Sequence, residues 1–392
     1  MTTPAAPPHE DALPSGTPPA LATTENRDPA SLGEVAIVHD YLNQRGGAEK
    51  VVLELADMWP EAPIYTSLYR PQSTFPEFAG RDVGTTLLDR LPIDKGFRDL
   101  FLLYPAAFHS LGDISGDVVI ASSSGWAHMA HAAPNSLHVV YCHTPARWLY
   151  RYEYLKTAGR RSRRQTFIAP VAPLMRRLDQ RAARRADLYI ANSRAVQHRI
   201  RSVYGIESTV VYPPVDTERF VPRPRGERLL VISRLLPYKH VGLVVRAATQ
   251  LGIGLDVVGD GPMLDELRRT AGTDVRFHGS VSQDTVVELL ESCNAVCVAG
   301  VEDFGIVAVE AQAAGKPVLA LGREGAVETI EEHVTGVFFH DQTEESLVQA
   351  LRLIQQLATP PEVIAAHAAR FSRAAFRRNL LAAIAARIET GA

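Results

Sequence analysis

The chain has 392 residues, which exceeds the size of a single ordinary core and predicts two domains. Apolar residues make up 46% of it and charged residues 22%, a composition typical of a soluble globular protein. The formal net charge of −3 argues against a protein built mainly to coat nucleic acid.

Residues 1–32 are rich in Pro, Ala and Thr and contain no apolar run long enough for a signal peptide. We expect them to form a disordered N-terminal tail. No later stretch reaches the ~18 consecutive apolar residues of a membrane span. The protein is therefore expected to be cytoplasmic, and peripheral contact with the inner face of the plasma membrane stays open.

Order is expected from Gly33 onward. The stretch EVAIVHDYL predicts a short strand, NQRGGAEK a glycine turn and VVLELADMWP a helix that ends before a proline. Further strands are predicted at 62–69, 117–124, 137–144 and 186–193, and the last of these ends in Asn-Ser, which caps the next helix. An extended segment at 210–220 leads into PRPRGE (222–227), which we interpret as a linker between domains.

A second alternating series of strands and helices runs from RLLVISR at 228–234 to PVLAL at 317–321, and closing helices are predicted at 344–357 and 361–390. Short strands that alternate with helices predict parallel sheets with crossover helices. The predicted fold class is α/β, with two doubly wound Rossmann-like domains at 33–221 and 226–374 and a cleft between them. The last helix, about 375–392, is expected to pack back on the first domain.

Three cysteines, Cys142, Cys293 and Cys297, lie in or beside apolar runs. Their odd number and apolar surroundings fit buried thiols in a reducing cytosol better than a disulfide framework. No cluster of Cys and His has the spacing of zinc ligands, and we predict no metal site.

Two glutamates mark the stretch VEDFGIVAVEAQAAGKPV (301–318). Glu302 directly precedes a predicted helix, and Glu310 lies about a turn and a half into it. The N-terminus of a helix offers free N–H groups to phosphate, and Gly305 allows a close approach. From the mouth of this helix, one carboxylate can accept hydrogen bonds from sugar hydroxyls and the other can reach a ribose. The simpler alternative is that the two glutamates bind no ligand: Glu302 would be a charge favoured by the helix dipole, and Glu310 would be solvated.

Two cations follow the strand VISR on the same face of the predicted sheet. Arg234 ends this strand, and Lys239 follows in the loop LLPYK. The planar guanidinium group of an arginine and the mobile ammonium group of a lysine together suit a pyrophosphate. A solvated loop is the simpler explanation of these two charges. The turn GDGP at 259–262 lies on that face too, but GDGPML lacks the third glycine of a dinucleotide fingerprint, so a Rossmann dehydrogenase is not expected.

In this order and spacing, VISRLLPYKH, VVGDGP, RFHGSVS and VEDFGIVAVEAQAAGKPV resemble the nucleotide-sugar domain of family 4 glycosyltransferases, retaining enzymes of the GT-B type. The resemblance runs from about residue 34 to the end. In the first half, HDYLNQRGGAEKV, YCHTPARWLY, DLYIANSRAV and VVYPPVDTERF resemble bacterial mannosyltransferases that build O-antigen and exopolysaccharide repeat units.

The resemblance implies a role for each matching residue. Glu302 would hold the hydroxyls of the donor sugar, Glu310 the ribose, and Arg234 and Lys239 the pyrophosphate. His143 would lie beside the reacting sugar, where a core histidine at a strand end is the alternative. The remaining implied donor contacts are Gly46 and Gly47 of the facing glycine loop, Gly259, the base-lining His278 and Gly279, and the backbone of Phe304, Gly305, Ile306 and Val307. Asp303 departs from the glycine that many relatives carry there.

The implied chemistry is transfer of a hexose, mannose from GDP-mannose, to a lipid-linked saccharide in cell-surface polysaccharide synthesis. Fixed cations and a helix N-terminus can hold the leaving diphosphate without metal, and no Asp-x-Asp motif occurs. The resemblance also implies front-face attack by the acceptor, since no carboxylate nucleophile is evident. No organic or metal cofactor is expected beyond the nucleotide sugar, which is a substrate.

Residues 147–185 form a region rich in arginine, with Trp148, Tyr150, Tyr152 and Tyr154 at its start. It fits an anionic membrane surface and a polyprenyl-diphosphate acceptor, or simply a solvated helix face whose Arg stems cover apolar surface. Nucleic acid is not an expected partner.

Three alternatives remain: a UDP-sugar donor, a nucleotide-sugar 2-epimerase of the same fold, and a non-catalytic binding protein. The epimerase needs acid/base carboxylates on the first domain's side of the cleft, and the motifs identify no such set.

Overall fold

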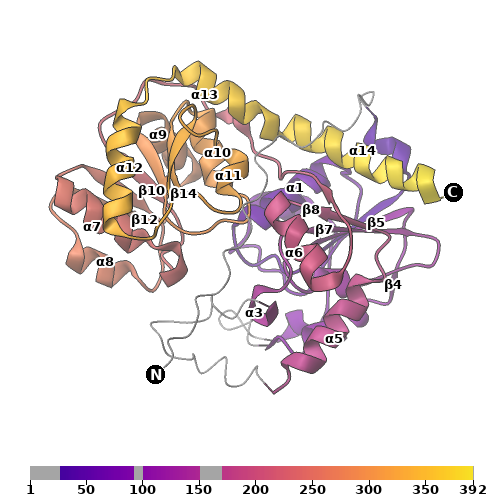
Figure 1. Ribbon diagram of the computed structural model, residues 1–392. Coiled ribbons are helices and arrows are strands. Elements are labelled where there is room, and N and C mark those ends of the chain that lie inside the picture. The colour runs from indigo at the N-terminus through magenta and orange to yellow at the C-terminus, as the bar shows by residue number, and fades with distance from the viewer. Residues whose placement is uncertain (1–26, 92–99, 151–169, 392) are drawn as a thin grey trace, which may run out of the picture.

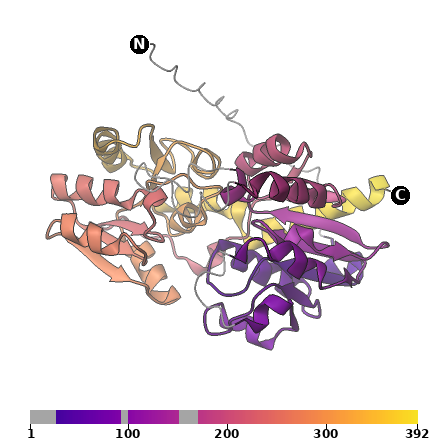
Figure 2. The same ribbon diagram turned by 90° about the horizontal axis from the view of Figure 1, so that it is seen from below.

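The computed structural model describes residues 27–91, 100–150 and 170–391. They form two lobes, each built around a parallel β-sheet with helices on both faces (Figure 1, Figure 2). The predicted fold class, two doubly wound parallel sheets, is confirmed. The segments 1–26 and 151–169 belong to the predicted tail and basic region and lie outside the described residues.

The first sheet has the strand order β3-β2-β1-β5-β7-β8-β9. Its central strand β1 sends Ala36 and Val38 into one apolar cluster and Val35 and Ile37 into another, because side chains alternate between the two faces of a sheet. Burial on both faces explains why the strand is an unbroken apolar run. The strands are β1 (Val35–His39), β2 (Ile64–Thr66), β3 (Val83–Thr85), β5 (Val118–Ser123), β7 (Leu137–Cys142), β8 (Leu188–Ala191) and β9 (Thr209–Val210).

Helices and a small two-stranded sheet surround this first sheet. Helix α6 begins as predicted from its Asn-Ser start: the Ser193 hydroxyl accepts the Val196 N–H, and Gly205 ends the helix in the left-handed conformation. The elements are α1 (Gly47–Met58), α2 (Tyr104–His109), α3 (Arg147–Tyr150), α5 (Ala172–Ala183), α6 (Arg194–Tyr204), β4 (Asp113–Ile114) and β6 (His131–Ala132).

The second sheet has the strand order β12-β11-β10-β13-β14-β15, again with parallel neighbours. Two apolar clusters cover its faces. Its strands are β10 (Leu229–Ile232), β11 (Leu255–Val258), β12 (Val275–Gly279), β13 (Ala295–Val298), β14 (Val318–Leu321) and β15 (Gly336–Phe339), and its helices are α7 (Val241–Leu251), α8 (Leu264–Thr270), α9 (Gln283–Ser292), α10 (Ile306–Ala313), α11 (Ala326–Thr329) and α12 (Glu344–Gln356).

The chain then returns to the first lobe. The single helix predicted at 361–390 is wrong: helix α13 (Pro361–Ala368) gives way to a 3₁₀ turn at Ala369–Phe371, and α14 (Arg373–Gly391) follows. Helix α14 lies along the first lobe (Figure 1), where Phe376, Leu380 and Ile384 join that lobe's core. The turn thus separates α13, which contacts α10 of the second lobe, from α14, which packs on the first lobe.

Residues 27–32 contradict the prediction that the whole of 1–32 is a disordered tail. A 3₁₀ turn covers Pro29–Leu32, Leu32 is buried in the core beside α1, and the Pro29 carbonyl accepts the indole N–H of Trp59. The buried leucine, this hydrogen bond and the Asp28 carboxylate, which accepts the Ala30 N–H, order a stretch whose composition alone suggested disorder. In the described ranges, none of the helices has the length and apolarity to cross a membrane.

Candidate active site

A cleft of about 1460 Å³ separates the two lobes, and the loops that follow the strands of both sheets line it. This is the expected position for a ligand site in doubly wound sheets, since the strand ends of each sheet meet there. All the predicted site residues line the cleft except His278 and Gly279; those that do are Gly46, Gly47, His143, Arg234, Lys239, Gly259, Glu302, Phe304, Gly305, Ile306, Val307 and Glu310.

His278 and Gly279 do not line the cleft, unlike the other predicted site residues. His278 lies on the edge strand β12, and its Nε2 is 2.8 Å from Asp256 Oδ1 on the neighbouring strand. This contact keeps the imidazole on the sheet, away from the cleft. The lining begins one residue later, at Ser280, and continues to Gln283. A strand end predicted from sequence is uncertain by a few residues, which is enough to displace such an assignment.

Glu302 follows strand β13 and contacts Lys239 of the facing loop, with Lys239 Nζ 2.6 Å from Glu302 Oε1. Lys239 sits in a 3₁₀ turn, Pro237–Lys239, that packs against the backbone at Gly300. The predicted cation and the first predicted carboxylate are therefore neighbours at the rim of one sheet.

Glu310 projects from helix α10 toward the other lobe. Lys50 of helix α1 approaches it, with Nζ 2.5 Å from Glu310 Oε1. The two predicted carboxylates thus each hold a lysine of their own, so they are not a proton-sharing pair. Lys50 was missed by the sequence reasoning, although it stands four residues after Gly46 in the predicted glycine turn.

Two helix N-termini face each other across the cleft. Gly305 caps helix α10 at φ +92°, which favours glycine, and the backbone N–H groups of Ile306 and Val307 follow it with no acceptor among the described residues. Gly46 caps helix α1 on the other lobe. A side chain at Gly47 would meet Ile306, because its Cβ would lie 2.7 Å from Ile306 Cδ1. The two lobes therefore approach each other closely at these two positive helix ends.

Arg234 follows strand β10 at the same rim as Lys239. Its side chain is exposed to the cleft, and it forms no ion pair within the described ranges. The combination of Arg234, Lys239 and the N-terminus of α10 makes this wall attractive to a pyrophosphate.

His143 follows strand β7 on the opposite wall. Its Nε2 lies 2.8 Å from the hydroxyl of Ser122, a buried residue of strand β5. Burial, with a smaller contribution from nearby His39, lowers the pKa of His143 to about 3, so the imidazole is neutral near pH 7. A neutral imidazole can donate one hydrogen bond and accept another.

Asp303 joins the lobes. Its carboxylate contacts the guanidinium groups of Arg147 and Arg199, both from the first lobe, and Arg199 also contacts Glu324. Nearby, Glu328 of helix α11 accepts the N–H groups of Arg194 (2.8 Å) and Ala195 (3.1 Å) at the start of helix α6. The departure from glycine at Asp303 therefore has a structural role, because it adds an interlobe contact.

Two further carboxylates line the cleft on the first lobe and were missed. Asp40 accepts backbone N–H groups from Ser124 (2.5 Å), Trp126 (2.8 Å) and Ala127 (2.7 Å), which fixes the loop after β5. Glu49 accepts an amide N–H from Gln44. The motif HDYLNQRGGAEK contained both, but only the fold shows that they face the cleft.

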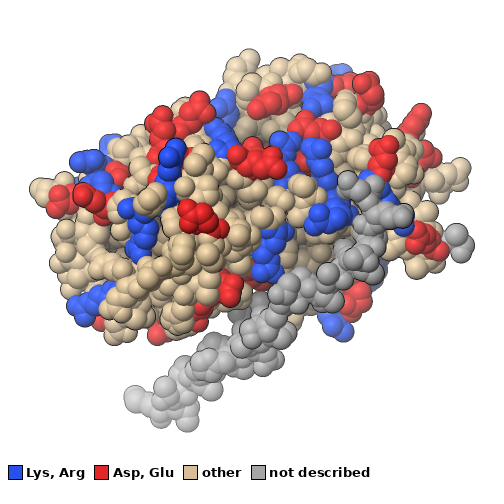
Figure 3. Space-filling view, turned by 90° about the horizontal axis from the view of Figure 1, so that it is seen from above, with Lys and Arg blue, Asp and Glu red and all other residues tan. Residues whose placement is uncertain are grey.

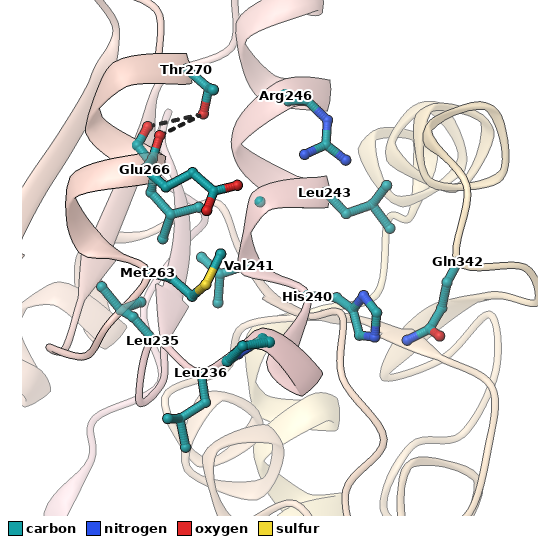
Figure 4. A pocket seen from close by; sticks show the side chains of 13 residues that line it. Leu235, Leu236, His240, Val241, Leu243, Arg246, Met263, Glu266, Thr270 and Gln342 are labelled. Carbon is teal, nitrogen blue, oxygen red and sulfur yellow. Dashed lines mark hydrogen bonds between the residues drawn. The ribbon is translucent and has the colours of Figure 1, made fainter. Parts of the chain in front are cut away.

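A smaller pocket of about 180 Å³ lies behind the Lys239 loop, between helices α7 and α8 (Figure 4). Leu235, Leu243 and Met263 give it apolar walls, and Arg246 and Glu266 lie at its border. None of the predicted site residues lines this pocket.

Two family models match the chain. Residues 45–219 match the model described as "Glycosyltransferase Family 4", and residues 216–376 match "Glycosyl transferases group 1". The boundary between the models falls at the end of the first lobe.

Among curated proteins, a stretch of 212 residues is 31% identical to a GDP-mannose-dependent alpha-(1-6)-phosphatidylinositol monomannoside mannosyltransferase of Mycobacterium tuberculosis, covering 46% of this chain and 55% of that one. A D-inositol 3-phosphate glycosyltransferase of Kribbella flavida is 29% identical over 219 residues, or 47% of this chain and 51% of the other. The chain spans about half the length of the curated relatives it matches.

Solved structures agree on the fold. The Anabaena protein Alr3699/HepE, solved in complex with UDP and glucose, superposes with a TM-score of 0.69 at 21% identity over 89% of this chain and 98% of that one. Sucrose-phosphate synthase of Thermosynechococcus elongatus superposes with a TM-score of 0.70 at 16% identity over 92% and 100%. The two family models match the two consecutive lobes of this GT-B fold, so the chain carries a family 4 glycosyltransferase domain followed by a group 1 glycosyl transferase domain.

Proposed function

We propose that this protein is a retaining glycosyltransferase that moves a hexose from a nucleotide sugar to an acceptor bound on the first lobe. The observation that carries the proposal is the cleft wall where Glu302, Glu310, Arg234 and Lys239 gather around the N-terminus of α10, opposite His143. Sugar hydroxyls would bind at Glu302 and ribose hydroxyls at Glu310. The pyrophosphate would lie between Arg234, Lys239 and the helix mouth.

The reaction would separate positive charge on the sugar ring from negative charge on the diphosphate. Arg234, Lys239 and the N–H groups of Ile306 and Val307 would stabilise the departing diphosphate, and this requires no metal ion. His143 would contact the sugar from the first lobe. Retention would follow if the acceptor hydroxyl attacks the face that the diphosphate leaves.

For the donor we propose GDP-mannose, which is supported by the mannosyltransferase named among the curated relatives. A UDP-hexose is the second candidate, since the Anabaena neighbour of the same fold was solved with UDP and glucose. Calorimetric titration with GDP-mannose, UDP-glucose, and the TDP- and ADP-sugars separates these candidates. Binding of a UDP-sugar alone would replace the mannose proposal, and binding of none would favour a non-catalytic protein.

For the acceptor we propose a lipid-linked saccharide, reached from the cytoplasmic face of the plasma membrane. The described part of the basic region supports contact with anionic lipid. On helix α5, Leu174 and Leu178 are 59% and 41% exposed, beside the exposed Arg177, Arg181 and Arg184. Exposed leucines among arginines suit the boundary between headgroups and acyl chains. On the face seen from above Figure 1, basic and acidic side chains are interspersed instead (Figure 3).

Flotation with vesicles of neutral or anionic phospholipid tests this contact. We expect binding to anionic vesicles at low salt, and loss of binding when Leu174 and Leu178 are both changed to Ser. Leu353→Ser is the matched control, because Leu353 is 48% exposed on helix α12 of the other lobe. Equal flotation of both variants would show that α5 is not the contact.

Transfer itself is tested by incubating the protein with the donor that binds and with a membrane extract as the acceptor source. Release of free nucleoside diphosphate together with a glycosylated lipid supports the proposal, and the anomeric configuration of the product tests retention. Conversion of the nucleotide sugar into its 2-epimer without transfer would favour the epimerase instead. Asp40 and Glu49, the carboxylates on the first lobe's side of the cleft, would then be its candidate acid/base groups.

A further inference from the structure

A chain of buried polar side chains lies behind His143. It runs from Glu49 on helix α1 through His39 at the end of β1 and Ser122 on β5 to His143 after β7. The first three are at most 1% exposed. The chain thus connects the glycine loop at the start of α1 with the histidine that faces the cleft.

The distances give the order of the contacts. Glu49 Oε1 lies 3.8 Å from His39 Nε2. His39 Nδ1 lies 3.0 Å from the Ser122 carbonyl oxygen and 3.2 Å from its hydroxyl oxygen. The Ser122 hydroxyl then lies 2.8 Å from His143 Nε2.

The charges around His39 determine its protonation. Burial alone would lower the pKa of His39, but the carboxylates of Glu49 and Asp40 and the Ser122 carbonyl outweigh it, and the pKa is raised. The ring of Tyr41 lies beside the imidazole, with 6.4 Å between the two ring centroids. The Ser122 carbonyl oxygen can only accept a hydrogen bond, so His39 Nδ1 carries a proton whichever charge the ring has.

The direction of the next hydrogen bonds follows from this protonation. His39 Nδ1–H donates to the carbonyl and hydroxyl oxygens of Ser122, so the Ser122 hydroxyl is left to donate its own proton to His143 Nε2. A ring nitrogen that accepts carries no proton, and a neutral imidazole then holds its proton on Nδ1. Among the described residues His143 Nδ1 has no hydrogen-bond partner, and His143 lines the cleft.

We propose that His39, held by Glu49 and acting through Ser122, is a positioning residue that fixes His143 as the neutral Nδ1–H tautomer and directs this N–H into the cleft. The inference rests on the proposed function in one respect, namely that His143 lies beside the transferred sugar. There the fixed N–H donates to a hydroxyl of that sugar. The tautomer itself is a property of the free protein and is tested without any substrate.

Nitrogen NMR of protein labelled at histidine tests the tautomer. The signals of His143 are identified by their loss in His143→Gln. We expect an unprotonated Nε2 and a protonated Nδ1 in the wild type between about pH 6 and 8, because the pKa of the group lies far below that range. In Ser122→Ala, which removes the donor to Nε2, we expect both tautomers. A proton on Nε2 of wild-type His143 overturns the proposal, whatever the activity of the protein.

Two substitutions at His39 separate positioning from simple packing. Asn places an amide N–H near the site of ring Nδ1, whereas Leu supplies only volume. We expect His39→Leu to allow both tautomers of His143 and to lower kcat by about tenfold or more with little change in donor KM, and His39→Asn to restore both properties in part. His138→Leu, which removes another buried histidine from strand β7, is the control and should leave the tautomer of His143 unchanged.

The outcomes are distinguishable from failure of the proposed function. If no transfer is found but the tautomer and its response to Ser122→Ala are as expected, the positioning inference stands and the activity is different. If transfer is found and His39→Leu keeps both the wild-type tautomer and the wild-type kcat, the positioning inference is wrong and the activity stands.

Discussion

Lys50 in the first lobe and Glu310 in the second form an ion pair across the cleft, with Lys50 Nζ 2.5 Å from Glu310 Oε1. Glu302 has a similar partner in Lys239. Two unpaired carboxylates would repel the diphosphate of a nucleotide sugar, and the lysines offset this repulsion. In the function proposed here, the hydroxyl groups of the donor would share Glu302 and Glu310 with these lysines.

The Lys239–Glu302 pair leads to the first prediction. Glu302→Ala and Lys239→Ala should each lower kcat/KM for transfer by about a hundredfold or more, since each removes a group that we place against the reacting sugar or the leaving diphosphate. Thermal stability should change little, because both residues line the cleft and neither belongs to an apolar core cluster.

The measurement combines steady-state kinetics with a melting curve for each variant. Glu332→Ala is the control, because Glu332 is an exposed carboxylate of the same lobe that does not line the cleft. Normal turnover of Glu302→Ala or Lys239→Ala in a folded protein would refute the site.

The second prediction concerns Glu310 and the ribose. A hydrogen bond to a charged group contributes about 1.5–3 kcal/mol, so Glu310→Gln should weaken donor binding by about tenfold or more. Wild-type protein should also prefer GDP over its 2′,3′-dideoxy analogue, and Glu310→Gln should lose most of that preference. Calorimetry of the four combinations isolates the contact, and an unchanged preference in the variant would place the ribose elsewhere. If a uridine donor binds instead, the same comparison uses UDP.

The third prediction concerns closure of the lobes. Arg199→Met removes the guanidinium that contacts Asp303 and Glu324 of the other lobe, so the donor-free protein should open. Small-angle scattering should show a larger radius of gyration, and the donor KM should rise because closing the cleft then costs part of the binding energy.

Arg201→Met is the matched control on the same helix. Arg201 is largely exposed, and its carboxylate partner Glu207 lies in the same lobe as Arg201. Neither the radius of gyration nor the donor KM should therefore change. Equal scattering curves for wild type and Arg199→Met would mean that the interlobe ion pairs do not hold the lobes together.

The fourth prediction is metal independence. Arg234, Lys239 and the N-terminus of α10 supply positive charge where we place the diphosphate, so transfer should be fully retained in EDTA. The assay compares initial rates with EDTA, with added Mg²⁺ and with neither. Loss of activity in EDTA that Mg²⁺ restores would contradict the mechanism.

The fifth prediction is the pH dependence of stability. Burial lowers the pKa of His138 to about 4 and that of His143 to about 3, whereas an unfolded histidine titrates near 6.5. The unfolded state binds more protons than the folded state below about pH 6.5, so stability should fall as the pH is lowered from 7 toward 4. His39, whose pKa is raised, acts in the opposite direction and loses its contribution as the pH rises through that pKa.

Denaturant unfolding at pH 7 and pH 5 measures this slope. Between pH 7 and pH 5 the free energy of unfolding should fall by about 2 kcal/mol less in His138→Leu than in the wild type, since one pKa unit corresponds to about 1.4 kcal/mol. A variant with the same pH slope as the wild type would show that His138 is protonated in the folded state.

The sequence predicted the elements well where a pattern is local. Ser193 and Gly205 cap helix α6 as their residue types indicate, and Glu302 and Gly305 stand between strand β13 and helix α10 because an apolar run, a glycine and an Ala-rich run follow one another. Local patterns are less informative where one or two residues determine whether a stretch is ordered or where a side chain lies. Leu32 orders a stretch with the composition of a tail, and His278 contacts Asp256 on the neighbouring strand instead of the cleft.

By itself, the sequence determined that two parallel sheets form and that glutamates, cations and a glycine turn stand at strand ends and helix starts, because these features depend on the periodicity and backbone preferences of short segments. Only the tertiary structure decided that Lys50 meets Glu310, that Arg199 meets Asp303, and that His39 supports His143 through Ser122. These partners are from 21 to 260 residues apart in the chain. The packing of whole strands and lobes brings such residues together, and no short segment encodes it.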